Sequence, residues 1–278
     1  MTVSVLAALS AFAVGGTAIM VVARPVSAFA RQYVYDLELA DAEEAASHSD
    51  KDEEDRPPSP GAEPAASDSE SSLRGSSSSS DRTTIRVRWL LLPVPQTVLA
   101  AVLCGLTLLW GASWGAWAET VVALPIVALL GATCSVDAVC HRLPDRLLWP
   151  TATWTGAATL TLLILHVAAG TPLSNAAWIA ARTILCALCA GLAIVAMIAL
   201  IPWSGMGLGD AKLCTVLGLW LGYFNTEYAA LGIILGFFIG GVAAIILMVA
   251  RIASRKTLIA FGPYLAAGGW LTWMLAVA

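Results

Sequence analysis

The sequence predicts an all-α membrane protein, a polytopic bundle of about eight transmembrane helices. Hydrophobic residues make up 58% of the 278-residue chain, whereas charged residues make up only 12%. The apolar residues also occur in long runs, most of them close to the roughly 20 residues that an α-helix needs to cross a bilayer. This composition excludes an ordinary soluble domain, and the net charge of −4 gives no indication of nucleic-acid binding.

The apolar runs place the predicted helices approximately at residues 3–23, 93–114, 119–136, 147–169, 179–202, 212–224, 227–249 and 258–278. The first run could instead be a cleaved signal peptide, although its basic residues follow the apolar stretch rather than precede it. The sixth run is short, at about 13 residues, and rich in glycine. We expect it to begin earlier, within the preceding glycine-rich stretch, or to be surrounded by protein.

The segment from residue 35 to residue 82 changes character abruptly, because it is acidic and rich in serine and proline. Such a segment buries too little apolar surface to offset the entropy lost on ordering. We therefore predict four parts: an N-terminal transmembrane helix at 1–23, a disordered cytoplasmic linker at 24–92, a second transmembrane helix at 93–118 and a six-helix domain at 119–278. The linker is either a solvated tether or a binding or phosphorylated segment.

The distribution of lysine and arginine predicts the orientation. Residues 24–92, 137–146, 203–212 and 250–257 hold every Lys and Arg except Arg182. Since positively charged loops stay in the cytoplasm, these segments are predicted to face it, with the N-terminus outside a cell membrane that the chain crosses several times. Arg142 and Arg146 are interpreted as topology determinants. Structural roles are expected for the charged residues near the opposite boundary, which are Glu119, Arg182 and Glu227.

The cysteines and histidines do not form a pattern typical of a cofactor or metal site. The six cysteines lie in or beside apolar runs, at positions 104, 134, 140, 186, 189 and 214. Cys186 and Cys189 form a single CxxC within an apolar run, where packing is the better explanation. We therefore expect no metal and no cofactor. Serine-protease and metalloprotease motifs are also missing from the sequence.

Two carboxylates interrupt the apolar C-terminal half. Asp137 begins DAVCHRLPD just after one apolar run, and Asp210 lies in GMGLGDAKL just before another. Ionisable groups at membrane depth are costly and usually functional. Two complete crossings separate the two residues, so both are predicted to emerge on the cytoplasmic face, where they could meet.

The residues around each carboxylate have local roles. Pro144 is expected to end one helix, and Asp145 to cap the next. Gly207 and Gly209 allow close approach of a peptide to the backbone. Considered singly, each motif also has a structural explanation, since interfacial aspartates cap helices and alternating glycines let helices pack.

Paired carboxylates suit the hydrolysis of an amide bond. Two such groups held close share one proton, because both cannot ionise comfortably side by side. The ionised partner can then activate a water molecule while the protonated partner donates to the carbonyl oxygen. An aspartic peptidase is therefore the chemistry that Asp137 and Asp210 predict.

At these motifs the chain resembles the type IV prepilin peptidases. The resemblance covers about residues 119–278 and rests on three stretches in order: Asp137 with Pro144-Asp145, then Gly207-Leu208-Gly209-Asp210 with Lys212-Leu213, Gly218 and Gly222, and then Ala260-Phe261-Gly262-Pro263-Tyr264-Leu265-Ala266. It implies that Asp137 and Asp210 are the catalytic pair of a GxGD-class aspartic protease. The remaining site residues, which shape the site or bind substrate, would be Gly207, Gly209, Lys212, Pro144 and Asp145.

The resemblance also implies a substrate and a cellular process. The expected reaction is removal of a short basic leader from prepilin or pseudopilin precursors at the cytoplasmic membrane face, in type IV pilus assembly or protein secretion. Larger members of the family also methylate the new N-terminus, using a segment with paired CxxC motifs between the first two helices. Here that position holds the cysteine-free linker, so we predict that methyltransferase activity is absent.

Several alternatives stay open at the level of sequence. The nearest is a GxGD protease for another membrane substrate. A different class is a proton-coupled transporter with Asp137 and Asp210 as relay groups, which would favour acids near the bilayer midplane and a repeat between halves. A structural anchor for the acidic linker is a third. Lys212 either supports the GxGD segment and its carboxylates or serves only as a cytoplasmic anchor. No particular oligomeric state is indicated.

Overall fold

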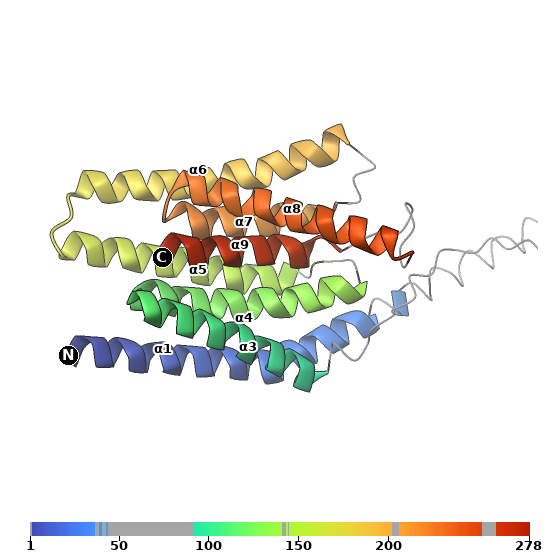
Figure 1. The fold of residues 1–278 in the computed structure, drawn as a ribbon, viewed down its shortest axis with the longest axis horizontal. Helices are drawn as coiled ribbons and strands as arrows, with labels where there is room; N and C mark the ends of the chain where they lie inside the picture. Colours follow the sequence, from blue (N-terminus) through green and yellow to red (C-terminus); the bar gives the residue numbers. More distant parts are fainter. Residues whose placement is uncertain are drawn as a thin grey trace, which may run out of the picture.

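The computed structural model describes residues 2–36, 39, 40, 43, 92–140, 143, 145–201, 206–251 and 260–278, and these residues contain helices and no strands. The predicted all-α bundle is thereby confirmed, and Figure 1 shows its helices lying side by side. The elements are α1 (Thr2–Val21), the π-helical turn η1 (Val22–Val26), α3 (Pro93–Trp114), α4 (Trp117–Cys140), α5 (Asp145–Ala168), α6 (Leu173–Leu200), α7 (Leu208–Gly222), α8 (Thr226–Val249) and α9 (Gly262–Val277).

Six helices within the described residues are long and apolar enough to cross a membrane. They correspond to the first five predicted runs and the seventh. The other two, α7 and α9, have only 15 and 16 residues. The expectation for the short sixth run is confirmed, because α7 begins at Leu208, before the predicted start at residue 212, and most of its residues are buried in protein.

The first helix extends beyond its predicted end at residue 23. The π-helical turn η1 contains Pro25, and residues 27–36 continue as helix. Proline lacks an N–H and disturbs the normal α-helical ladder, and a π turn absorbs such a disturbance within a helix. Val26, Ala30 and Val34 are buried at a spacing of four, in one cluster with residues of α4 and α5. The helix therefore occupies the first part of the predicted linker, of which residues 44–91 lie outside the described residues.

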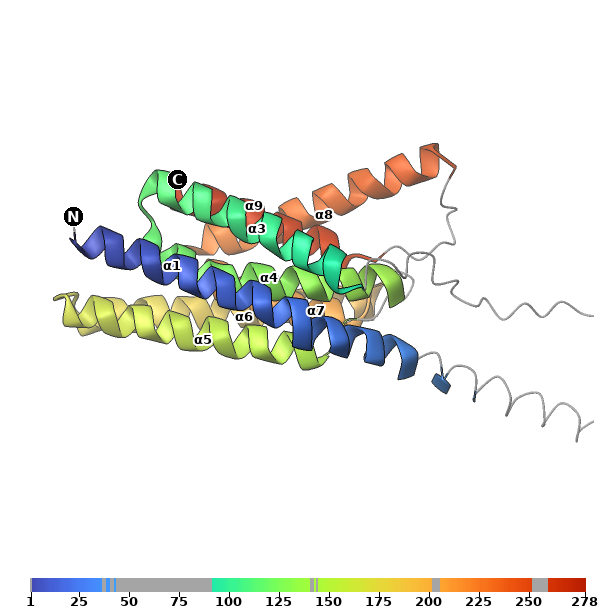
Figure 2. The same cartoon turned by 90° about the horizontal axis from the view of Figure 1, so that it is seen from below.

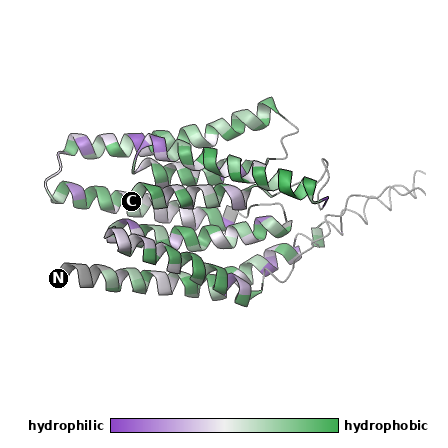
Figure 3. Ribbon diagram, in the orientation of Figure 1, coloured by the Kyte–Doolittle hydropathy of each residue, from purple (hydrophilic) through white to green (hydrophobic). Residues whose placement is uncertain are grey.

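Helices α4 and α7 organise the two buried clusters of the bundle. In Figure 2, α4 lies between α3 and α5, and residues of α4 contribute to both clusters. One cluster joins α4 to α1 and α3, whereas the other surrounds α7 with residues of α4, α6 and α9. Figure 3 shows that α6 and α8 consist mostly of hydrophobic residues. Large apolar side chains of these outer helices are exposed, among them Leu185, Leu188, Leu192, Ile234, Phe238 and Ile245. Such a surface suits a lipid environment.

Helices α8 and α9 meet through glycines. A β-carbon at Gly268 would collide with the backbone nitrogen of Gly236 and would lie 2.6 Å from the carbonyl oxygen of Gly232. A β-carbon at Gly236 would lie 2.8 Å from the Cα of Leu265. Small residues let helix backbones approach this closely in membrane proteins. The position of α9 is consequently set by direct backbone contact with α8.

Arg182 closes the far end of the short helix α7, in agreement with its predicted structural role. Its Nε donates to the carbonyl oxygen of Gly222 at 3.1 Å, and its Nη2 donates to the carbonyl oxygens of Tyr223 at 2.6 Å and Phe224 at 3.0 Å. The last carbonyls of a helix have no partner within the helix. One side chain of α6 thus satisfies three acceptors at the end of α7.

The substitution Arg182→Met is expected to destabilise the protein by about 1–3 kcal/mol, because it removes charge-assisted hydrogen bonds and leaves the carbonyls of α7 unpaired. Thermal unfolding in a lipid nanodisc measures the effect. Leu185→Met, on the exposed face of the same helix, is the control and should leave the midpoint unchanged. An unchanged midpoint in Arg182→Met would show that these hydrogen bonds add no stability.

Gln96 is the least satisfied side chain of α3. It is 2% exposed, and neither its amide nitrogen nor its amide oxygen has a hydrogen-bond partner within the described part of the chain. Leaving a buried polar group unpaired costs about 1–3 kcal/mol, so Gln96→Met is expected to stabilise the protein by a similar amount. A rise in the thermal midpoint would support this, and a fall would show that the amide has a favourable partner. Gln96→Glu should lower the midpoint.

Candidate active site

The two carboxylates singled out by the sequence lie at the same end of the bundle. Asp137 is near the end of α4, and Asp210 is in the first turn of α7. Figure 1 shows the end of α4 and the start of α9 at this end. Both side chains are buried, with exposed fractions of 3% and 6%. Asp210 acts electrostatically on Asp137, and both carboxylates act on the thiol of Cys134, so the two lie in the same neighbourhood of the fold.

Asp210 is held by the turn that begins α7. Gly207 is the N-cap residue, and its N–H donates to Oδ2 of Asp210 at 3.0 Å. The Asp210 N–H donates in return to the Gly207 carbonyl oxygen at 3.1 Å, so the carboxylate and the backbone of this turn are joined by two hydrogen bonds. The other carboxylate oxygen, Oδ1, is buried and has no partner among the described residues. One oxygen is therefore fixed, and the other is available to a reactant.

Asp137 is held by the start of α9. The N–H of Gly262, the first residue of α9, donates to Oδ2 of Asp137 at 3.0 Å, and Pro263 follows in the first turn. The first N–H groups of a helix lack internal partners and carry partial positive charge, so they favour a carboxylate. A β-carbon on Gly262 would lie 2.7 Å from Oδ2 of Asp137, which leaves room only for glycine. The resemblance had included Gly262, but the sequence assigned it no role.

The other predicted site residues differ in what the structure describes. At Gly209, a β-carbon would lie 2.8 Å from Cβ of Leu143, so this glycine permits a close approach. Lys212 is exposed on α7, and both of its predicted roles stay predictions. Pro144 lies outside the described residues, whereas Asp145 is the first residue of α5.

Curated proteins named prepilin leader peptidase/N-methyltransferase are similar to this chain. The chain is 34% identical to the one from Neisseria gonorrhoeae over 202 residues, which cover 72% of the chain and 61% of that protein. It is 28% identical to the one from Pseudomonas putida over 207 residues, covering 72% of the chain and 62% of that protein. It is 32% identical to the one from Aeromonas salmonicida over 175 residues, which cover 63% of the chain and 54% of that protein. The chain is a relative of the prepilin leader peptidase family.

The extent of the match is partial. The chain spans 61% of the length of the Neisseria gonorrhoeae protein and 62% of the length of the Pseudomonas putida protein. No family model matches the chain, and no solved structure matches it. The predicted resemblance is confirmed by the curated relatives, whose names combine the peptidase with the methyltransferase.

Helices α7 and α9, whose first turns hold Asp210 and the Gly262 N–H, are shorter than a bilayer core. At 1.5 Å per residue, the 15 residues of α7 and 16 residues of α9 extend about 22–24 Å, less than the roughly 30 Å of a bilayer core. Figure 1 shows α8 projecting past the start of α9.

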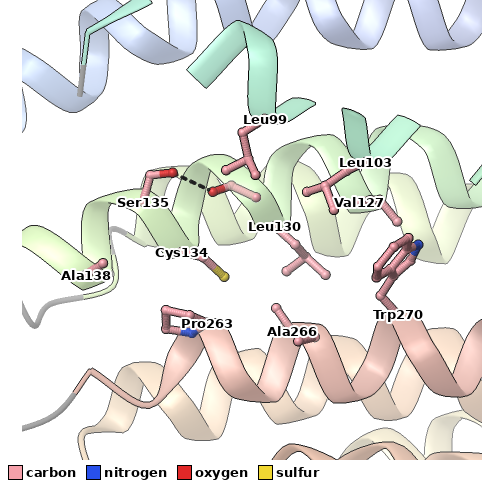
Figure 4. A pocket seen from close by; sticks show the side chains of 12 residues that line it. Leu99, Leu103, Val127, Leu130, Cys134, Ser135, Ala138, Pro263, Ala266 and Trp270 are labelled. Atoms are coloured by element: carbon pink, nitrogen blue, oxygen red, sulfur yellow. Dashed lines mark hydrogen bonds between the residues drawn. The ribbon is translucent and has the colours of Figure 1, made fainter. Parts of the chain in front are cut away.

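The described part of the bundle contains a cavity of about 310 Å³. It lies between α3, α4 and α9, as Figure 4 shows. On α4, Cys134 and Ala138 flank the position of Asp137, and on α9 Pro263 follows Gly262. The sequence did not indicate this cavity. No group of three or more His, Cys, Asp or Glu side chains in the described part of the chain is placed to hold a metal ion.

Proposed function

We propose that the protein is a membrane-embedded aspartic endopeptidase that removes the leader from prepilin-like precursors, with Asp137 and Asp210 as its catalytic pair. The main support is geometric. Two buried carboxylates from separate helices are each fixed by a backbone N–H, and Oδ1 of Asp210 is buried with no hydrogen-bond partner among the residues that the structure describes. A buried polar atom without a partner calls for an explanation, and a catalytic role is one of the few available. The similarity to prepilin leader peptidases supports the same activity.

The proposed mechanism requires one carboxylate to be ionised and the other protonated. The ionised group accepts a proton from water while the water oxygen bonds to the carbonyl carbon of the cleaved peptide bond. The protonated group donates its proton to the carbonyl oxygen, which gives a tetrahedral diol. Collapse of the diol re-forms the carbonyl, breaks the C–N bond and passes a proton to the departing amine. We assign the water to Oδ1 of Asp210, since Oδ2 already accepts from Gly207.

The finer details follow from charge and composition. Among the described residues of the segments predicted to be cytoplasmic, Arg146 and Lys212 lie near the starts of α5 and α7, and Lys212 is two residues from Asp210. Basic residues next to the carboxylate support cleavage of a short basic leader at the cytoplasmic membrane face. The substrates would be prepilin or pseudopilin precursors anchored in the bilayer. Residues 24–92 contain no cysteine, which supports a peptidase without methyltransferase activity, unlike the combined names of the relatives. The transporter hypothesis has no support from the comparisons.

The test is co-expression of the full chain with precursors that carry a basic leader, followed by intact-mass measurement of the precursor in isolated membranes. We expect a product that lacks the leader and carries an unmethylated N-terminus. A product heavier by one methyl group would contradict the predicted absence of methyltransferase activity. Intact precursor throughout, across several prepilin and pseudopilin sequences and at verified membrane levels of the protein, would contradict the proposed function.

A further inference from the structure

The first helix continues past its π turn as a helical extension, residues 27–36. Figure 1 shows this extension at the end of the bundle where α4 ends. Ala30 of the extension is completely buried, in one hydrophobic cluster with Val136 and Val139 of α4. These two valines lie on either side of Asp137 in the sequence. The extension therefore packs on the part of α4 that carries the carboxylate.

The extension and α9 lie on different sides of this part of α4. With 3.6 residues per turn, Val136 and Val139 point about 100° and 160° away from Asp137 around the helix, in the same sense. Asp137 itself turns toward α9, where the Gly262 N–H donates to its Oδ2 at 3.0 Å. The last turn of α4 is thus held between the start of α9 and the extension.

The position of Asp137 within α4 makes this support important. Helix α4 ends at Cys140, so Asp137 is one of its last four residues. The carbonyl groups of the last four residues have no partner within the helix, and helix ends open more readily than helix centres. The hydrogen bond from Gly262 holds the carboxylate, but it does not hold the backbone of the turn. Apolar contacts from the extension reach the opposite side of that backbone.

A second contact fastens the extension to α5. The guanidinium carbon of Arg146, in the first turn of α5, lies 6.0 Å from the centroid of the Phe29 ring, which is within the range of a cation–π interaction. The Phe29 ring also stacks on Tyr33, with centroids 5.9 Å apart. Leu147 of α5 is buried in the same cluster as Ala30. The extension therefore bridges the end of α4 and the start of α5.

We propose that the extension positions Asp137 for the reaction by holding the last turn of α4, with Ala30 as its central positioning residue and the Phe29–Arg146 contact as a second support. The proposal rests on the proposed function. Because Ala30 is completely buried, a larger side chain there must push the extension away from α4 or displace the turn that it contacts. Either change alters the position of the carboxylate relative to the start of α9.

The experiment compares the same substitution at two neighbouring positions of the full chain, Ala30→Leu and Ala28→Leu. Ala28 is exposed, so it serves as the matched control. We expect Ala30→Leu to lower kcat for leader removal by about 10-fold or more with KM unchanged, because displacements of about 1 Å in a catalytic geometry cost up to 10²-fold. Hydrogen–deuterium exchange in lipid nanodiscs should show amides 137–140 exchanging about 10-fold faster, since overpacking weakens the contact that protects them. Ala28→Leu should match the parent in both measurements.

A milder pair of variants tests the second support. Phe29→Leu keeps an apolar side chain but removes the ring that Arg146 contacts. It should lower kcat by roughly 2- to 5-fold, the range expected from an exposed cation–π contact. Phe29→Trp supplies a ring again and should restore kcat to near the parental value. This pair does not overpack the bundle, so it stays informative if Ala30→Leu is poorly folded.

Three results would overturn the positioning proposal. One is a parental kcat in both Ala30→Leu and Phe29→Leu. Another is faster exchange of amides 137–140 in Ala30→Leu without any loss of kcat. The third is faster exchange throughout the bundle, which would indicate general destabilisation rather than a local role. If the parent protein cleaves no precursor, the proposed function itself fails, whereas the exchange measurement still shows whether the extension holds the last turn of α4. The two failures are therefore distinguishable.

Discussion

Asp137→Asn and Asp210→Asn are each expected to lower the rate of leader removal by at least about 100-fold, because acid–base groups of this kind contribute roughly 10²–10⁴ in rate. Asparagine keeps the shape of the side chain and its carbonyl oxygen can still accept from the Gly262 or Gly207 N–H. It cannot exchange a proton with water or with the substrate. The fraction of precursor processed per unit time in isolated membranes measures the effect.

Glu119→Gln is the matched control for these substitutions. It makes the same chemical change in the first turn of α4, at the opposite end of the helix that carries Asp137. Its rate should equal that of the parent once the membrane levels of all variants are matched. Normal processing by either aspartate variant would show that the carboxylates are not the catalytic pair, even if the protein does remove leaders.

Gly262→Ala is expected to lower the rate by about 10- to 100-fold, since displacements of about 1 Å in a catalytic geometry cost up to 10²-fold. The new β-carbon would lie 2.7 Å from Oδ2 of Asp137, closer than real side chains approach. Either the carboxylate or the start of α9 must move, and the hydrogen bond from the Gly262 N–H weakens in both cases. The loss should be in kcat, with the protein still present at normal levels in the membrane.

The matched control for Gly262→Ala is Gly156→Ala on α5, where a β-carbon meets nothing within 4 Å. That variant should retain parental rate and thermal midpoint. Parental kcat in Gly262→Ala would mean that the position of Asp137 does not depend on the backbone of α9. A fall in kcat accompanied by an equally large fall in folded protein would point instead to a role in assembly of the bundle.

The positions of the helices were predictable because each membrane span contributes many apolar residues in succession. A membrane span needs roughly 20 apolar residues in succession, so composition alone locates such helices. Asp137 and Asp210 were predictable for the opposite reason, since carboxylates are rare in the apolar half and each one is conspicuous. Their placement at one end of the bundle followed from the two crossings between them.

Features made by contacts between distant helices were not predictable. The Gly262 N–H that holds Asp137 is a backbone group, and nothing in a sequence marks which carboxylate it will reach across 125 residues. Leu99 and Leu103 look like ordinary span residues, yet they line the cavity between α3, α4 and α9. The first apolar run ended at residue 23, whereas the π turn carries the helix onward.

The glycine contact between α8 and α9 divides the bundle into a fixed side and an adjustable side. Backbones in direct contact have no side chains between them that could change rotamer, so α9 and its first N–H cannot shift without separating from α8. Helix α3 instead contacts α9 through side chains. The indole N–H of Trp110 donates to the carbonyl oxygen of Met274, and that of Trp270 donates to Thr107. Such hydrogen bonds can break, and the leucines of α3 can repack. We therefore expect α3 to move more readily than α9 relative to the rest of the bundle.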